Sequence, residues 1–141
     1  MVFFSSIGEN TTHFVEKLPY ESVRVPVKLT EPELFVDREY VLITPTYGAG
    51  RDTGAVPKQV VKFLRHRKHR DLCKAIVGTG NRNFGEHFLL APRMLSETMG
   101  KPVLYGIEVS GTSLEVKETV RRIDAFWPDR NQDSPRSSNE N

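Results

Sequence analysis

Short apolar runs recur along the chain and are separated by polar stretches. Four of these runs, at 2–4, 41–43, 75–77 and 103–105, are continuous rather than alternating. Continuous runs are typical of strands in a parallel sheet, because helices cover both faces of such a sheet. A weaker run at 22–27 brings the number of predicted strands to five.

Segments with helical spacing lie between the runs. The clearest is the last, where apolar residues recur every three or four positions and share one helix face: Val116, Val120, Ile123 and Trp127. Thr112 and Glu115 have the spacing of a capping box. The sequence therefore predicts a helix that begins at Thr112.

Three further helices are predicted. The apolar positions of the first two are Phe14, Val15 and Leu18, and then Val56, Val60, Phe63 and Leu64. Pro57 suits a first helical position in the second of them. The third helix is expected at about 92–99, after a turn at 86–90, since Pro92 favours a helix start and Gly100 a helix end.

Strands that alternate with helices predict an α/β fold: a five-stranded, parallel, doubly wound sheet of order 2-1-3-4-5, with right-handed crossovers and helices on both faces. One domain is expected over residues 1–127. The stretch 128–141 has no apolar residue and is predicted to be a disordered tail. Ligands of such sheets bind beyond the carboxyl ends of the strands, so the loops after strands one, three and four are the candidate site.

Composition indicates a soluble globular protein, with 38% hydrophobic and 27% charged residues in a chain of 141. We expect neither a membrane helix nor a secretory signal, because no apolar run has the required length or flanking charge. The single cysteine, Cys73, excludes an internal disulfide and suits a reducing cytoplasm. Cys73 opens an apolar run and is predicted to be a core residue.

The net charge is only +2, but residues 62–70 hold five Lys or Arg, two His and no acid. This basic segment is either a docking patch for an acidic partner or a helix end whose cations complement the helix dipole. Nucleic acid is not expected, since the chain lacks a recognition motif. The spacing of the four histidines suggests no metal site.

The loop after strand one reads "SSIGENT", from Ser5 to Thr11. Its hydroxyl groups, its glycine and the following helix N-terminus favour a bound phosphate. It lacks a lysine and Walker-type spacing, which argues against a nucleoside triphosphatase. The alternative is an ordinary helix start capped by Asn10 or Thr11.

The loop after strand three, "TPTYGAGRDTGAVP" (44–57), is long for such a connection. Tyr47 precedes bare backbone at Gly48, Ala49 and Gly50, so a planar ring could stack on Tyr47 while main-chain groups bond the edge of that ring. The alternative is a tyrosine that only covers the end of the sheet.

The loop after strand four lies in "IVGTGNRNFGEHF" (76–88). Its glycines permit positive φ or close backbone approach, and Asn81 and Asn83 tolerate left-handed conformations. Phe84 is either a second wall of a pocket or a plug over the core. Together, a phosphate cradle, an aromatic platform and a conformable backbone loop describe a site for flavin mononucleotide (FMN).

These loops carry a family resemblance. The flavodoxin phosphate loop typically reads Ser/Thr-x-Thr-Gly-x-Thr, and here Ser6 and Thr11 match while Gly8 and Glu9 depart from it. The chain is more similar to the NrdI family of flavodoxin-like proteins, which activate class Ib ribonucleotide reductase. The likeness extends from Val2 to Trp127 and is carried by "FSSIGENTTHFVEKL", "TPTYGAG", "GAVPKQVVKFL", "GTGNRNFGEHF" and "LYGIEVSGTSLEV".

The resemblance implies non-covalent FMN held by three groups of residues. The phosphate residues would be Ser5, Ser6, Ile7, Gly8, Asn10 and Thr11. The isoalloxazine ring would lie against Thr44, Pro45, Thr46, Tyr47, Gly48 and Ala49 on one side. On the other side it would meet Gly80, Asn81, Asn83, Phe84 and Gly85. Glu9 conflicts with this expectation, because a carboxylate repels a phosphate dianion unless it points outward.

The resemblance also implies partners. In the family, reduced flavin reacts with O₂ and delivers superoxide to the dimanganese site of the reductase small subunit, where the tyrosyl radical then forms. A further, unidentified reductant must supply the flavin with electrons. The protein would be an activator rather than an independent metabolic enzyme, and no side chain of its own would act as a catalytic acid, base or nucleophile.

The charge of the loops favours this reading over an ordinary flavodoxin electron carrier, which is the main alternative. The sequence pI is about 8.8, and the loops hold Arg51 and Arg82 against Glu9 and Asp52. Cations near the ring would stabilise anionic reduced flavin and attract superoxide. A response-regulator receiver is disfavoured, because no phosphoacceptor Asp ends strand three. A flavin-free interaction protein is a third alternative.

Overall fold

The sheet of this computed structural model is wholly parallel and has the strand order β2-β1-β3-β4-β5. The structure describes residues 1–5, 9–47, 54–80, 89–108 and 112–128. Its strands are β1 (Val2–Phe3), β2 (Val23–Arg24), β3 (Tyr40–Pro45), β4 (Cys73–Gly80) and β5 (Val103–Glu108). The predicted α/β flavodoxin-like fold and its strand order are confirmed.

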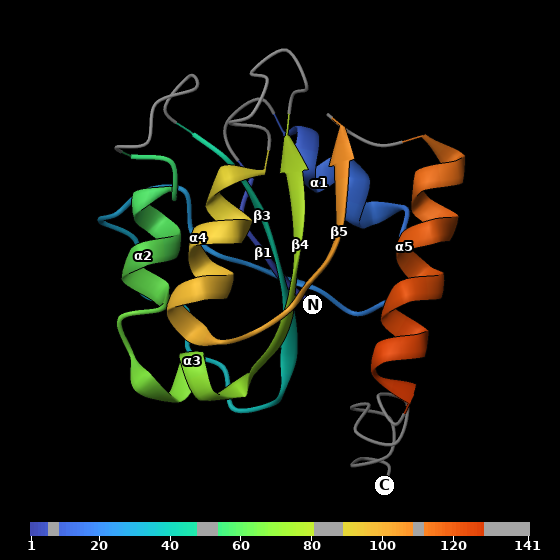
Figure 1. The fold of residues 1–141 in the computed structure, drawn as a ribbon. Helices are drawn as coiled ribbons and strands as arrows, with labels where there is room; N and C mark the ends of the chain where they lie inside the picture. Colours follow the sequence, from blue (N-terminus) through green and yellow to red (C-terminus); the bar gives the residue numbers. More distant parts are fainter. Residues whose placement is uncertain (6–8, 48–53, 81–88, 109–111, 129–141) are drawn as a thin grey trace, which may run out of the picture.

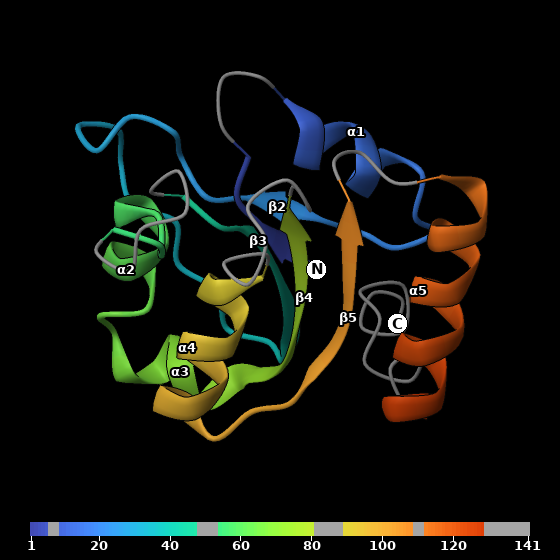
Figure 2. The same cartoon turned by 45° about the horizontal axis from the view of Figure 1, so that its top comes forward.

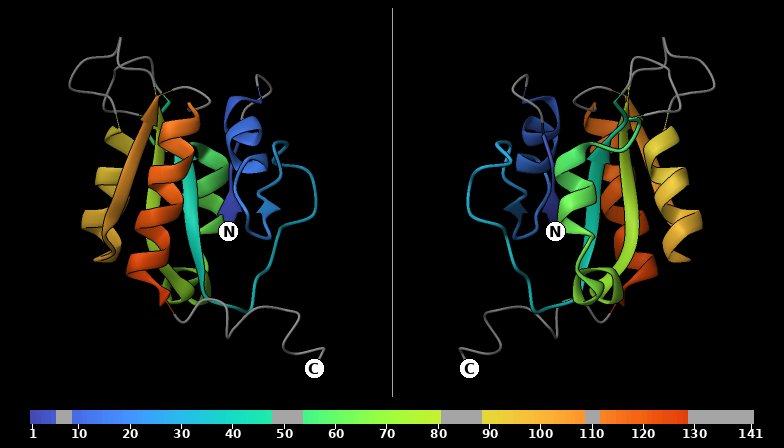
Figure 3. Two further views of the ribbon diagram at one scale, coloured as in Figure 1. Left: turned by 90° about the vertical axis from the view of Figure 1, so that its right-hand side faces the viewer. Right: turned by 90° about the vertical axis from the view of Figure 1, so that its left-hand side faces the viewer.

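Helices cover both faces of the sheet (Figure 1). They are α1 (Asn10–Glu16), α2 (Lys58–Phe63), α3 (Arg67–Leu72), α4 (Leu90–Met99) and α5 (Ser113–Phe126). The side views show α1 and α5 on one face and α2 and α4 on the other (Figure 3). Each face has its own apolar cluster, since β3 and β4 are buried on both sides.

The alternation of side chains along β3 explains the two clusters. Leu42 points into the cluster under α2 and α4, whereas Val41 and Ile43 point into the cluster under α1 and α5. All three side chains are fully buried. The continuous apolar run of this strand therefore follows from burial on two faces, as the sequence pattern predicts. Cys73 is also fully buried, so its predicted core position is confirmed.

The helix ends agree with the sequence in part. The α5 capping box is present: the Thr112 hydroxyl accepts from the Glu115 N–H at 3.2 Å, and the Glu115 carboxylate accepts from the Thr112 N–H at 3.0 Å. Gly100 ends α4 with φ of 69°, as predicted. The start of α4 was predicted too late, because the helix begins at Leu90 and Pro92 lies inside its first turn, where no backbone donor is needed.

One other local prediction needs correction, and the basic segment can be placed. Pro57 precedes α2 as its cap residue rather than being its first helical residue. The basic segment spans the end of α2, at Phe63, and a separate helix, α3. Arg70 of α3 donates to the carbonyls of Leu64 and Arg65, so one cation of the segment caps the end of α2 directly.

Replacing Thr112 by alanine is expected to lower the free energy of unfolding by about 1 kcal/mol, because the first turn of α5 loses its side-chain acceptor. Urea denaturation measures the change. Ser113→Ala is the matched control, since it removes a hydroxyl one residue later, at an exposed position in the helix. Equal effects of the two substitutions would contradict a role for the cap.

Candidate functional site

The candidate site lies where β1, β3 and β4 end side by side (Figure 2). Phe3 pairs with Ile43, and Pro45 pairs with Thr79, so the residues that follow these strands leave the sheet at the same edge. The helix that follows β1 and the helix that follows β3 lie on opposite faces of the sheet, so the gap between these strands is the switch point of a doubly wound sheet. The three predicted loops therefore start next to one another.

Ser5 anchors the start of the first loop. Its side chain is fully buried, and its Oγ accepts a hydrogen bond from the Thr12 N–H at 3.2 Å, in the first turn of α1. The predicted alternative of a cap by Asn10 or Thr11 is wrong, because Glu9 occupies the cap position without a side-chain capping bond. Ser5 supplies the capping acceptor from outside the helix instead.

Thr11 ties the same helix to the centre of the sheet. Its hydroxyl lies 3.0 Å from the hydroxyl of Thr79 near the end of β4, and both side chains are buried. This contact joins the segment after β1 to the strand that precedes the third loop. Buried hydroxyl groups thus join the described ends of two of the three loops.

Glu9 has a cationic partner that the sequence analysis missed. Arg24 of β2 donates from Nη2 to Glu9 Oε2 at 3.1 Å and to the Ser5 carbonyl at 3.0 Å. The Thr12 hydroxyl and Arg24 hold the pKa of the Glu9 carboxyl below its usual value. The sequence signal for this pair was an arginine between the valines of "SVRVPV", since a charged residue in a buried segment is usually paired.

The second loop begins with a fixed backbone. Thr44 is fully buried, and the Thr46 Oγ1 accepts from the Ala91 N–H at 3.0 Å, which links the end of β3 to the start of α4. The Tyr47 N–H donates to the Ala55 carbonyl at 2.7 Å. The start of the loop is therefore bonded to α4 through Ala91 and to the end of the same loop through Ala55.

The Tyr47 ring meets Phe4 edge to face, with centroids 5.9 Å apart and planes at 67°. Tyr47 is half-buried against the apolar cluster beneath α2 and α4. The ring thus covers the end of the sheet, which is one of the two interpretations of the sequence. Stacking of a flavin on this ring is still a prediction.

Two glycines allow α4 to approach the sheet closely. A Cβ at Gly78 of β4 would lie 2.5 Å from Pro92 Cγ, and one at Gly106 of β5 would overlap Leu89 Cδ1. Leu89, with φ of 67°, directly precedes α4 and follows the third loop. The bare backbone at these glycines therefore sets where that loop returns to the sheet.

The remaining predicted site residues lie outside the described part of the chain: Ser6, Ile7, Gly8, Gly48, Ala49, Asn81, Asn83, Phe84 and Gly85. Among the described ones, Asn10 begins α1, Pro45 ends β3 and Gly80 ends β4. Their contacts with a flavin stay predictions.

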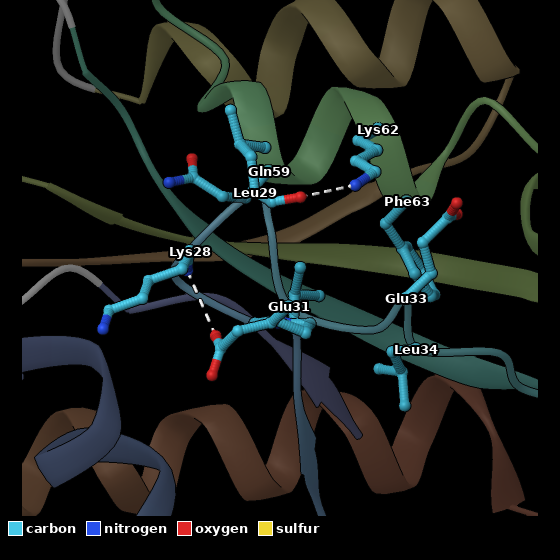
Figure 4. Close-up of a pocket in the computed structure, with 10 residues that line it drawn as sticks. Lys28, Leu29, Glu31, Glu33, Leu34, Gln59, Lys62 and Phe63 are labelled. Carbon is cyan, nitrogen blue, oxygen red and sulfur yellow. Dashed lines mark hydrogen bonds between the residues drawn. The ribbon is translucent and has the colours of Figure 1, made fainter.

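A hollow elsewhere on the molecule includes none of the predicted site residues. It lies between the 25–34 segment and α2, and bonds from Lys62 Nζ to the Leu29 carbonyl and from the Lys28 N–H to Glu31 hold its sides (Figure 4). In the described ranges, no three His, Cys, Asp or Glu residues are grouped to hold a metal ion. No helix among those ranges is long and apolar enough to cross a membrane.

The comparisons with known proteins agree with one another. A family model described as NrdI Flavodoxin like matches residues 2–121. Protein NrdI of Mycoplasmopsis pulmonis is 45% identical over 90% of this chain and 85% of the relative. Protein NrdI of Beutenbergia cavernae is 44% identical over 94% of this chain and 96% of the relative. Protein NrdI of Yersinia enterocolitica is 38% identical over 93% of this chain and 98% of the relative.

A solved short-chain flavodoxin, associated with a PDU bacterial microcompartment, has the same fold. Its TM-score is 0.60 at 14% identity, over 90% of this chain and 94% of that one. The parallel sheet, its strand order and the loops that start at one edge thus define a flavodoxin-like fold. The chain belongs to the NrdI flavodoxin-like family, as the family model and the relatives show, and this family implies a flavin cofactor.

Proposed function

We propose that the protein binds FMN and uses the reduced flavin to supply superoxide to the small subunit of a class Ib ribonucleotide reductase. The observation that carries the proposal is the convergence of three loop starts at the ends of β1, β3 and β4, in a chain of this family. Superoxide would oxidise the manganese site of the partner, so that its tyrosyl radical can form.

The described residues fit FMN. Ser5 and Thr11 provide buried hydroxyl groups at the edges of the first loop, and Arg24 compensates the charge of Glu9. The objection that an unpaired carboxylate would repel a phosphate dianion is thereby removed. Thr46 and Tyr47 hold the start of the loop proposed to lie against the ring.

When bound, the flavin would supply the electron that converts O₂ to superoxide. The protein would bind and orient the flavin. The first loop would hold the phosphate, and the second and third would orient the ring and limit its contact with water. Arg51 and Arg82 would favour the negative charge of reduced flavin and of superoxide. An unidentified reductant would return electrons to the flavin.

The first test is a visible spectrum of the purified protein with FMN, recorded during anaerobic reduction and again after mixing with oxygenated buffer and a superoxide trap. The proposal predicts bound flavin, full reduction and trapped superoxide. Bound flavin that reduces only at very low potential would instead indicate an electron carrier. A protein that takes up no FMN would contradict the proposal altogether.

Replacing Arg82 by glutamate is expected to lower the potential of the second flavin reduction, because an anion would replace a cation in the loop proposed to lie against the ring. The expected drop is on the order of tens of millivolts, since about 59 mV corresponds to tenfold in a one-electron equilibrium. A dye-coupled redox titration measures it. Arg67→Glu is the control, since Arg67 is exposed on α3, which precedes β4 and lies away from the loop edge. An unchanged potential in Arg82→Glu would refute the electrostatic role.

A further inference from the structure

Arg24 joins the two ends of the segment 6–8. One nitrogen, Nη2, donates to the Ser5 carbonyl before the segment and to the Glu9 carboxylate after it, at 3.0 and 3.1 Å. Arg24 comes from β2, at the edge of the sheet next to β1. The distance between Ser5 and Glu9 is therefore set by a side chain from outside the loop.

Glu9 is held in an uncommon conformation. Its φ of 65° and ψ of 15° are left-handed, which is unfavourable for a residue other than glycine, asparagine or aspartate. Its carbonyl accepts the first helical bond of α1, from the His13 N–H at 3.0 Å. The ion pair with Arg24 and this bond together fix Glu9 where the flavodoxin pattern has glycine.

The charges of the pair are only partly shielded from water. The side chains of Arg24 and Glu9 are 31% and 39% exposed, so each still acts on an anion bound close by. While they are paired, their fields largely cancel. Removing either partner would leave a full charge of one sign beside the segment 6–8.

We infer that the ion pair between Arg24 and Glu9 sets the net charge beside the phosphate end of the flavin, so that the pair determines the preference for FMN over riboflavin. The inference rests on the proposed FMN site. Arg24 supplies a cation beside the segment proposed to hold the phosphate. Glu9 keeps that end of the site close to neutral, which limits how tightly the phosphate dianion is held.

The test measures the dissociation constants of FMN and riboflavin, by flavin fluorescence, for the wild type, Arg24→Gln, Glu9→Gln and the double variant. Arg24→Gln leaves Glu9 unpaired and is expected to weaken FMN about tenfold. Glu9→Gln removes the carboxylate charge opposite Arg24 and is expected to tighten FMN about threefold, with a steeper dependence on salt. The double variant should return to within about threefold of the wild type, because both charges are gone.

Riboflavin separates this role from a structural one, since it has the ring but no phosphate. Its affinity should stay within about twofold in all variants, whereas a general loss of structure would weaken both ligands. Arg122→Gln is a matched control: Arg122 donates to a carbonyl, that of Leu104, and to a carboxylate, that of Glu118, as Arg24 does. Thermal unfolding of each variant, without ligand, checks that it is folded.

The outcomes are distinct. Parallel changes for FMN and riboflavin, or a double variant as weak as Arg24→Gln, would overturn the inference and leave the FMN site in place. Wild-type protein that binds neither flavin would overturn the proposed function and the inference with it. The predicted pattern, with Arg122→Gln at the wild-type ratio of affinities, would establish the pair as the determinant of phosphate preference.

Discussion

Replacing His69 by alanine is expected to lower the free energy of unfolding by about 3 kcal/mol. The imidazole is 1% exposed and is bonded at both nitrogens: Nδ1 donates to the Phe63 carbonyl at 2.7 Å, and Nε2 accepts from the Val36 N–H at 3.2 Å. The ring also stacks on Phe63, with centroids 4.1 Å apart. Alanine would leave a cavity and two backbone groups without partners.

Chemical denaturation measures this loss of stability. Two control variants separate the contribution of the hydrogen bonds from that of the ring and give the effect of removing an exposed histidine. His69→Phe keeps a ring for the stack but makes neither hydrogen bond, so it should lose about 2 kcal/mol. His13→Ala, at an exposed position on α1, should change stability by less than about 0.5 kcal/mol. A loss for His69→Ala no larger than that for His13→Ala would show that the buried imidazole does not hold the chain before β3 against α2.

Gly78→Ala is expected to destabilise the protein by about 2 to 3 kcal/mol and to weaken FMN binding as well. The new Cβ would lie 2.5 Å from Pro92 Cγ and 2.8 Å from Leu89 Cδ2. The ring of Pro92 is part of the backbone of α4, so the helix itself must shift. The third loop returns to the sheet directly before this helix, and the proposed flavin contacts would shift with it.

Gly106→Ala provides the matched comparison, because the three atoms nearest to its new Cβ all belong to the side chain of Leu89. Adding Leu89→Ala should recover part of the stability lost in Gly106→Ala and much less of that lost in Gly78→Ala, where Pro92 remains. Urea denaturation of the four variants measures the difference. Equal recovery in both backgrounds would show that Pro92 does not fix the distance between α4 and the sheet.

Much of the fold could be predicted from local patterns. Continuous apolar runs identified β3 and β4 because both faces of these strands are buried, and the capping box identified the start of α5 because two side chains satisfy that helix end. The start of α4 was misplaced because Pro92 is tolerated anywhere in a first turn. The break between α2 and α3 was not predicted, because the side-chain bonds of His69 and Arg70 to the carbonyls of Phe63 and Leu64 leave no mark in the spacing of apolar residues.

The candidate site was predictable in position but not in its contacts. Glycine-rich and hydroxyl-rich loops after strands one, three and four indicated the edge of the sheet, because parallel strands bring their carboxyl ends together. The pairing of Arg24 with Glu9 depends on β2 lying next to β1, so it became visible only in the fold. The bond between Thr11 and Thr79 joins residues far apart in the chain for the same reason.

The most direct test of the proposed function uses the partner. A class Ib small subunit loaded with Mn(II) is mixed with O₂ and with this protein in its FMN-bound, reduced form, and electron paramagnetic resonance records the tyrosyl radical. The account predicts a radical signal that requires both proteins and O₂ and that free reduced FMN does not produce. Absence of the radical, although the flavin is bound, reduced and reoxidised by O₂, would contradict the account.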